Sequence, residues 1–185
     1  NDPADNYIHD ARTPNPSIGG DLFIQPMGVR DHRPVDQKSL TFTTESLAED
    51  MEITGPSTAE LYVSSTADDT DFVVTLIDVR PDGYAAVLRQ DILRASRRES
   101  MSNPTPIKPG KIYKLTIPIY PVSNVFAKGH RLRLTVSSSS FPHWMPSHNK
   151  FNLNSEQAPY VAARNTVFHD AERPSVLTVA VIPAK

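Results

Sequence analysis

Cysteine is absent from this chain of 185 residues. Its absence excludes a disulfide framework, a thiolate nucleophile and a zinc site with cysteine ligands. Apolar runs of about 18 residues, long enough to cross a membrane, are absent too, so no membrane partner is predicted. Charge of one sign is not in excess, since 19 basic and 21 acidic residues give a formal net charge of −2. Without a basic stripe, no nucleic-acid partner is predicted.

A signal peptide is not visible at the start of the chain. The first five residues are polar and acidic, whereas a signal peptide begins with basic residues that an apolar segment follows. Any signal of a longer parent protein is therefore expected before Asn1. The bacterial cytoplasm and export both remain open as locations, because a chain without cysteine fits either compartment.

Proline, in contrast, is abundant, with 17 of 185 residues against a usual share of about 5%. Because proline has no backbone N–H, it disrupts helix interiors and central strands, and it collects in loops and at strand ends. The apolar share of 38% is typical of a globular protein, and the length suits one domain. The composition therefore predicts a single globular domain that is not mostly helical.

Residues 1–37 are predicted to form an extended N-terminal strap of this domain. Turn-forming pairs such as Asp2-Pro3 and Gly19-Gly20 punctuate the segment, and strong periodicity is lacking. A free loop of this length is uncommon in a compact domain, so we expect the strap to lie over another part of the fold. Its one apolar anchor is the stretch Leu22, Phe23 and Ile24.

Residues 38–185 show the pattern of β-strands separated by turns. In residues 111–119, Tyr113, Leu115 and Ile117 lie on one face and polar residues on the other, which is typical of a half-buried antiparallel strand. The sequence RPDG at 80–83 predicts a hairpin turn. Roughly eight to ten strands without a long amphipathic helix predict an all-β jelly-roll sandwich of two sheets. The predicted strands fall at residues 40–43, 59–64, 72–79, 84–88, 111–119, 131–138, 165–168 and 176–182.

A catalytic nucleophile is not apparent. No G-x-S-x-G motif occurs, and the four serines at 137–140 lie at the end of a predicted strand. A serine nucleophile needs a sharp strand–turn–helix geometry and a base within hydrogen-bonding reach, and a strand end supplies neither. The sequence therefore predicts no catalytic residue in this chain, and no cofactor is expected.

Metal ligands are equally hard to assign. Asp68 and Asp69 lie near Asp71 and Asp78, but the spacing lacks the glycine and the final glutamate of a calcium-binding helix–loop–helix motif. We expect Asp68 and Asp69 to cap N–H groups of their own loop. Asp71 and Asp78 are expected to pair with an arginine such as Arg131 or Arg133. No metal site is predicted, because the loop histidines also match no known ligand spacing: His143, His148 and His169.

The single tryptophan lies in a loop that prolines bound, with the sequence FPHWMP at 141–146. In jelly-roll modules that bind sugars, a loop aromatic often serves as a platform, because its flat apolar face suits the C–H side of a sugar. Phe141, His143 and Trp144 are therefore candidates for stacking on a ligand. The alternative is that Trp144 packs over the end of the sandwich.

Several sequence blocks occur in a fixed order along the chain: DPAD at 2–5, PSIGG at 16–20, FTTESL at 42–47, ITGP at 53–56, VSSTADDTDF at 63–72, LIDVRPDG at 76–83, ILR at 92–94, RRE at 97–99, NVF at 124–126, GHR at 129–131 and VSSSSFP at 136–142. Taken in this order, the blocks resemble the C-terminal domain of the X-Pro dipeptidyl-peptidase and cocaine esterase (CocE/NonD) family of serine hydrolases. The resemblance spans almost the whole chain and does not depend on any single short motif. One departure is the sequence HWMPSHN at 143–149, where family members commonly carry a polar Arg-Asn.

The resemblance implies a galactose-binding-domain-like jelly roll without catalytic residues. The Ser-Asp-His triad would lie in a preceding α/β-hydrolase domain, and the whole enzyme would hydrolyse an ester or amide through an acyl-serine intermediate. This chain would be the accessory domain that packs on the catalytic domain and helps to shape its substrate pocket. Leu22, Phe23 and Ile24 would then approach the pocket mouth, and the alternative is that they only anchor the strap.

A free-standing carbohydrate-binding jelly-roll module is the alternative function, and it depends on Trp144. The two functions differ in the surface that they require. An accessory domain is expected to expose an unusually apolar face where the catalytic domain docks, and self-association through that face is a second way of covering it.

Overall fold

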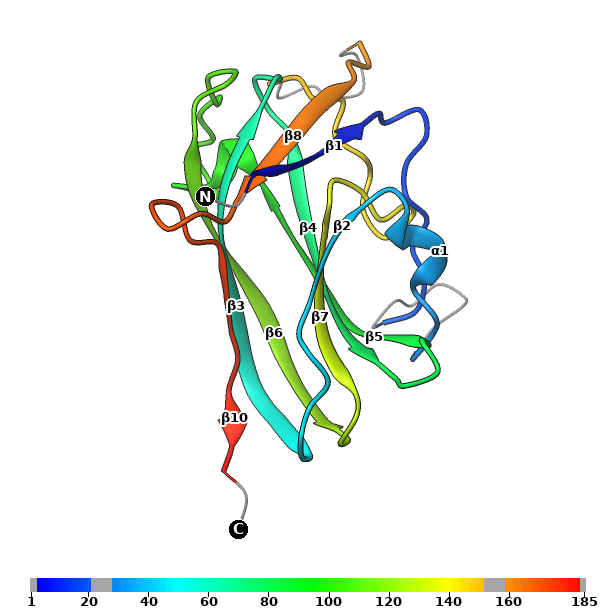
Figure 1. The fold of residues 1–185 in the computed structure, drawn as a ribbon. Helices are drawn as coiled ribbons and strands as arrows, with labels where there is room; N and C mark the ends of the chain where they lie inside the picture. The colour runs from blue at the N-terminus through cyan, green and yellow to red at the C-terminus, as the bar shows by residue number, and fades with distance from the viewer. Residues whose placement is uncertain (1–2, 21–27, 152–158, 184–185) are drawn as a thin grey trace.

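The computed structural model describes residues 3–20, 28–151 and 159–183, which form two antiparallel β-sheets packed face to face (Figure 1). The six-stranded sheet contains β1 (Asp5–His9), β3 (Met51–Ser65), β6 (Tyr113–Phe126), β8 (Ala163–Phe168), β9 (Val176–Thr178) and β10 (Val181–Ile182). The four-stranded sheet has the order β2 (Leu40–Thr43), β7 (Arg131–Ser137), β4 (Asp71–Val79) and β5 (Ala85–Arg94). The predicted all-β sandwich is confirmed, and the galactose-binding-domain-like detail stays a prediction.

Helical structure is limited in the part of the chain that the structure describes. It consists of α1 (Arg33–Asp36) and a 3-10 turn at Ala95–Arg97. None of the described helices is long and apolar enough to cross a membrane.

Strand β3 organises the larger sheet. Along one edge it pairs with β6, and along the other it pairs in succession with β10, β9 and β8. Strand β1 extends this sheet by pairing with β8, which places Asp5 opposite Val167. The N-terminal segment predicted as a strap therefore begins as a strand of the sandwich.

The alternation predicted for β6 is confirmed. Leu115, Ile117 and Ile119 are buried in the core, whereas Lys114 and Thr116 between them are exposed. The RPDG turn is confirmed as well, since the amide of Arg80 donates to Tyr84 O at 2.9 Å and Gly83 has a φ of 84°. A positive φ is the conformation that glycine adopts without a steric penalty.

The core between the two sheets consists of a main cluster and a smaller one, and Leu177 packs against both. Its largest fully buried side chains include Phe72 from β4 and Phe126 from β6. Facing residues from both sheets complete the main cluster, as expected for aligned sheet packing: Ala59, Leu61, Val63, Val74, Leu115, Ile117, Ile119, Leu134, Val136 and Val167.

Strand β4 differs from β6, because every one of its residues is buried. Phe72, Val74 and Leu76 face the core, so Val73, Thr75, Ile77 and Val79 must face the opposite side of the sheet. The strap covers that side. Over this face, the Nε2 of His32 lies 3.4 Å from the Nε2 of Gln90, and Arg133 donates to Asp36 at 2.7 Å. The same segment also bonds to the edge of β5, since His32 N donates to Ala85 O at 2.9 Å and Arg30 O accepts from Val87 N at 3.0 Å.

Candidate docking and binding surfaces

The predicted pocket-lining residues Leu22, Phe23 and Ile24 lie outside the described residues. The two glycines that flank them are described, and they form an antiparallel bridge. Gly20 N donates to Gly28 O at 2.8 Å, and Gly28 N donates to Gly20 O at 3.0 Å.

Gly19, next to this bridge, fixes the strap closely against β5. It has a φ of 65°, and a Cβ atom at this position would lie 2.5 Å from both Gly28 O and Val87 Cγ1. Only a residue without a side chain fits such a close approach. The base of the Gly20–Gly28 bridge is therefore held against the edge of the four-stranded sheet.

The predicted ligand-stacking residues Phe141, His143 and Trp144 lie together in one loop after β7. The His143 and Trp144 rings are stacked, with centroids 3.8 Å apart and planes at 18°. Phe141 N donates to Asn15 O at 2.8 Å, and His143 N donates to Ser17 Oγ at 3.0 Å. The loop is thus fastened to the strap, and Phe141 itself is exposed.

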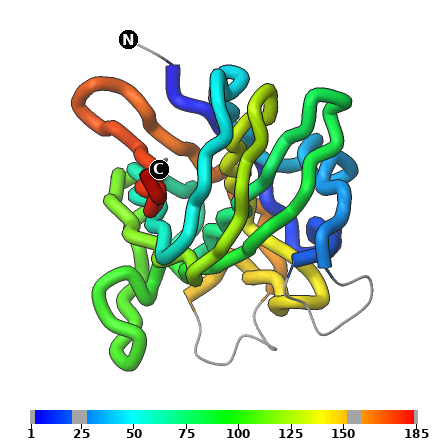
Figure 2. The backbone as a smooth tube through the Cα atoms, turned by 90° about the horizontal axis from the view of Figure 1, so that it is seen from below, coloured from blue at the N-terminus to red at the C-terminus, as the bar shows by residue number. Residues whose placement is uncertain are grey.

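A hollow of about 260 Å³ lies beside Trp144. Trp144 and Met145 line it together with Arg97 and Met101 from the segment after β5. Figure 2 shows both segments, in yellow and green, on the lower side of the view, while the orange turn at 168–175 lies on the upper side. Met101 and Met145 are 68% and 74% exposed, so they offer apolar surface at the hollow beside its charged lining residues Asp71, Arg94 and Arg97.

Two buried aspartates support the floor of this region. Asp71 accepts two hydrogen bonds from Arg94, at 2.8 and 3.0 Å, and its side chain is 3% exposed. Asp69 accepts from Ser96 N at 2.9 Å and from Ser96 Oγ at 2.8 Å. Burial raises the pKa of the Asp69 carboxyl, and the hydrogen bonds from Ser96 oppose that rise.

The prediction that Asp71 pairs with an arginine is confirmed, but the partner is neither Arg131 nor Arg133, and for Asp78 the prediction was wrong. Asp71 binds Arg94, because the pairing of β4 with β5 places these two residues opposite each other. Asp78 lies 2.8 Å from the Nδ1 of His130. Arg133 instead donates to Asp36 of α1 at 2.7 Å, since its side chain points to the covered outer face of the sheet.

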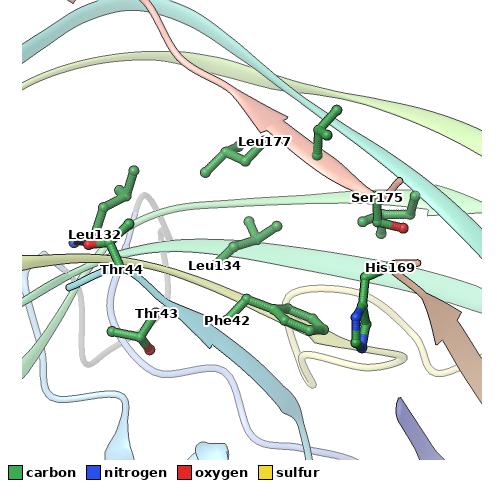
Figure 3. Close-up of a pocket in the computed structure, with 10 residues that line it drawn as sticks. Phe42, Thr43, Thr44, Leu132, Leu134, His169, Ser175 and Leu177 are labelled. Atoms are coloured by element: carbon green, nitrogen blue, oxygen red, sulfur yellow. Dashed lines mark hydrogen bonds between the residues drawn. The ribbon is translucent and has the colours of Figure 1, made fainter. Parts of the chain in front are cut away.

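A second apolar surface is a groove of about 320 Å³ between β2 and β9 (Figure 3). Phe42, Leu134 and Leu177 line it, and the ring of His169 lies edge-on to Phe42 at 5.9 Å. Leu134 belongs to the main core cluster, and Phe42 and Leu177 pack against that cluster. The groove is therefore the open side of the core itself, which the strand pattern did not reveal because it depends on how the two sheets meet.

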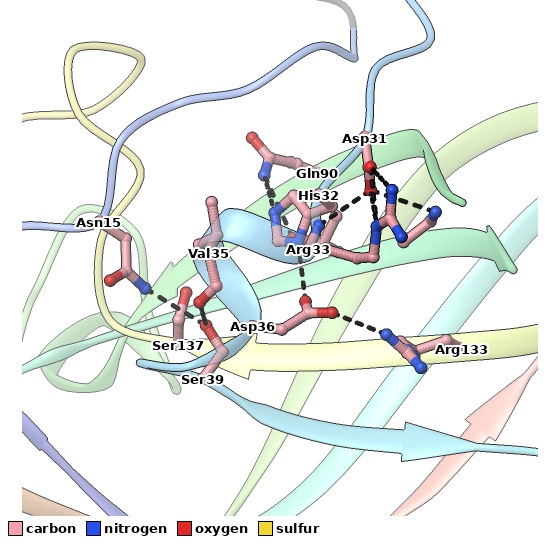
Figure 4. A network of polar contacts seen from close by, with 12 residues as sticks. Asn15, Asp31, His32, Arg33, Val35, Asp36, Ser39, Gln90, Arg133 and Ser137 are labelled. Atoms are coloured by element: carbon pink, nitrogen blue, oxygen red, sulfur yellow. Dashed lines mark hydrogen bonds and ion pairs between the residues drawn. The ribbon is translucent and has the colours of Figure 1, made fainter. Parts of the chain in front are cut away.

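Beneath the strap lies a buried polar network (Figure 4). Gln90 donates to Thr75 Oγ1 at 3.2 Å and accepts from Ser140 Oγ at 3.0 Å, and its Nε2 lies 3.4 Å from the Nε2 of His32. His32 Nδ1 in turn lies 3.2 Å from Asp36. The network joins the strap, β4, β5 and the serine run, so it fixes the strap in one position.

The serine run at 137–140 is buried and bonded to the strap and to the strands around it. Ser138 Oγ accepts from Asn165 Nδ2 at 2.8 Å and lies 2.7 Å from the hydroxyl of Tyr7. Ser139 Oγ accepts from Asn15 N at 2.9 Å. Burial raises the pKa of Tyr7, which therefore stays protonated as a hydrogen-bonding group. These serines join β7 to β1, β8 and the strap.

His9 at the end of β1 is a further buried titratable group. Its Nε2 lies 3.2 Å from Ser147 O. Burial lowers the pKa of His9 below its ordinary value of 6.5, although Ser147, Asp71 and Asp10 act in the opposite direction. Within residues 3–20, 28–151 and 159–183, no three His, Asp or Glu side chains come together as a set that could hold a metal ion.

Comparison with known families decides the identity of the domain. Residues 2–178 match the family model of the X-Pro dipeptidyl-peptidase C-terminal non-catalytic domain. The chain belongs to this family. The match covers nearly the whole chain and confirms the resemblance that the sequence blocks predicted.

Relatives of this X-Pro dipeptidyl-peptidase C-terminal domain are hydrolases about three times as long. Cocaine esterase from Rhodococcus sp. (strain MB1 Bresler) is 38% identical over 192 residues, which cover 97% of this chain and 32% of the esterase. An aminopeptidase from a marine sediment archaeon of the Thaumarchaeota has a TM-score of 0.87 at 30% identity, over 98% of this chain and 33% of its own. An α-amino acid ester hydrolase also has a TM-score of 0.87, at 28% identity, over 97% of this chain and 32% of its own.

The chain therefore spans about a third of the length of the proteins it matches, and its family is described as non-catalytic. Two exposed residues of this C-terminal domain were missed by the sequence reasoning, namely Met101 and Met145. Their signal was weak but present: both are large apolar residues inside polar, proline-containing loops.

Proposed function

We propose that this domain packs on an α/β-hydrolase catalytic domain and helps to form the mouth of that domain's substrate pocket. The observation that carries the proposal is the cocaine esterase match, in which 97% of this chain corresponds to 32% of a much longer hydrolase. The named activities of the similar proteins are hydrolyses of esters and peptides. The parent reaction is accordingly acyl transfer to water from an ester or amide, with the nucleophile in the other domain.

The strap is the part of the domain that we assign to the pocket. Its described residues on either side of Leu22, Phe23 and Ile24 are bridged at Gly20 and Gly28 and held against β5 at Gly19. A base fixed in this way suits a segment that must present apolar side chains to a partner. Leu22, Phe23 and Ile24 are therefore proposed to line the acyl side of the pocket.

Two measurements test this function. The chain alone is expected not to turn over p-nitrophenyl acetate, and turnover that a serine-directed inhibitor abolishes would contradict the proposal. In a second step, the chain replaces the matching third of cocaine esterase. The chimera is expected to hydrolyse esters, and Phe23→Ala in the chimera is expected to raise KM about tenfold, the loss that follows from removing one well-buried apolar contact.

The matched control for Phe23→Ala is Val125→Ala, at an exposed apolar residue of β6. It is expected to leave KM within about twofold, because removing a surface side chain away from the pocket changes little. Equal effects of the two substitutions on KM would argue against a pocket role for the strap.

A further inference from the structure

Among the residues that the structure describes, Met101 and Met145 are two of the most exposed apolar side chains, and they line one hollow together with the half-buried Trp144 and with Arg97; we call these four residues the Met–Trp surface. Its two segments lie more than forty positions apart in the sequence and are brought together by the fold around one hollow. Contiguous exposed apolar residues on a soluble domain mark an interaction site. Methionine, tryptophan and arginine are moreover enriched in the cores of protein interfaces.

Hydrogen bonds and ring stacking already hold the residues of the Met–Trp surface in place in the domain alone. Trp144 N donates to Ser140 O at 3.0 Å, and His143 stacks on the indole ring. On the other side, Arg97 Nη1 donates to Met101 O, and Asp69 holds the neighbouring Ser96. Groups that are already ordered lose little conformational entropy on binding, so such a surface is suited to a stable contact.

We propose that the Met–Trp surface is the docking surface for the catalytic domain of the longer hydrolase, and this inference rests on the proposed function above. The size of the missing partner is given by the relatives, whose chains are about three times as long as this one. The surface is also continuous with the strap, since Pro16 forms a bridge with Phe141 and Ser17 N donates to Phe141 O at 2.7 Å. One domain seated on Trp144 would therefore also lie beside the strap.

The chemistry of the hollow favours a protein partner over a sugar. His143 already occupies one face of the Trp144 ring, and the guanidinium of Arg94 is bound to Asp71. Two flexible methionines form the rim, where a sugar site would place several fixed polar groups around the aromatic platform. The partner face is expected to be apolar, with an acceptor for Arg97.

Oxidation of Met101 and Met145 tests whether the catalytic domain covers them, because peroxide oxidises an exposed methionine to its sulfoxide. The chain alone and the same chain in the cocaine esterase chimera are treated with hydrogen peroxide, and the sulfoxide at each methionine is measured by mass spectrometry. We expect Met101 and Met145 to oxidise at least tenfold more slowly in the chimera. Met51, which is half-buried on β3 far along the chain from both loops, is the internal reference and is expected to keep its rate.

The outcomes separate this inference from the proposed function. If the chimera hydrolyses esters while Met101 and Met145 oxidise as fast as in the chain alone, the catalytic domain docks elsewhere and the inference is wrong. If the chimera folds without activity and no methionine is protected, the proposed function fails with it. If the chimera does not fold, hydrogen exchange of the two corresponding loops is measured in native cocaine esterase and in its matching third alone. Slower exchange in the native esterase supports the inference, and equal exchange contradicts it.

A double substitution adds a second measurement in the chimera. Met101→Ser with Met145→Ser is expected to lower the melting temperature of the chimera but not that of the chain alone, because both side chains are exposed in the chain alone. Val125→Ser, at another exposed apolar residue, is the matched control and is expected to change neither. Glycan-array binding that Trp144→Ala abolishes would overturn the inference in favour of a sugar ligand.

Discussion

The outer faces of the two sheets differ in what covers them. On β6 of the larger sheet, Lys114 and Thr116 are exposed, and the strand alternates between buried and exposed positions. On β4 of the smaller sheet, no position is exposed, because the strap and α1 lie over the face that points away from the core. The same strand geometry thus gives β6 a single buried face and β4 two.

The covered face teaches how the strap is held. It contains Thr75, Gln90 and His32 beside apolar residues such as Ile77, and all of them are buried. Buried polar groups must find partners, and here they find one another across the strap. An apolar cover alone would have left the position of the strap less strictly defined, whereas this network specifies one register.

The largest difference between the two outer faces is expected for truncated side chains. Ile77→Ala removes a fully buried side chain beneath the strap and should lower the free energy of unfolding by about 4 kcal/mol, as core truncations do. Thr116→Ala, at an exposed position of β6, should change it by about 0.5 kcal/mol or less. Urea unfolding of both variants measures this, and similar effects would mean that the strap does not seal the face.

A smaller loss is expected where the strap touches β5. Gly19→Ala places a methyl group 2.5 Å from Gly28 O, so the strap must shift, at a cost of about 3 kcal/mol from crowding and the positive φ together. Gly110→Ala is the control, since its φ of 77° is similar but no atom lies within 4 Å. It should cost only about 1 kcal/mol. Equal melting temperatures for the two variants would contradict a close approach at Gly19.

The smallest expected effect is on the pH dependence of stability, and it concerns His9 at the end of β1. Burial lowers the pKa of His9, so the folded state binds the proton less readily than the unfolded state. The stability that neutral His9 contributes is therefore complete above its ordinary pKa of 6.5 and is lost as the pH falls below that value. In urea titrations between pH 7.5 and about 5, His9→Gln should lose less stability than the unchanged chain. Parallel pH profiles for the two proteins would be evidence against a buried neutral His9.

The sequence predicted the strands well where one face meets water. The pattern of Leu115, Ile117 and Ile119 predicted β6, and the RPDG turn predicted the β4–β5 hairpin. The second half of β5 was not predicted, because Arg89, Gln90 and Asp91 look like loop residues until the cover over them is known. Strand β1 was missed for a related reason, since only its last residue is buried and its pairing partner lies near the other end of the chain.

For the Met–Trp surface, the sequence indicated only which types of residue to consider. A tryptophan in a proline-bounded loop could be singled out, but the sequence does not show that Met101 joins it from another loop, because that contact is tertiary. The partners of the aspartates could not be chosen from the sequence for a similar reason. Choosing Arg94 as the partner of Asp71 requires the register at the far end of the β4–β5 pair, and a register shift between Leu76 and Ile77 separates that end from the turn.

The pairing of β1 with β8 has a consequence for how the chain reaches this structure. Asp5–His9 are synthesised near the beginning of this domain, yet their partner Ala163–Phe168 is synthesised near its end. Contacts between such distant segments slow folding, because a long loop must close before they form. The strap and its polar network depend on that closure at their N-terminal end. Assembly of the covered face is thus expected to be a late step, completed only after almost the whole domain has been made.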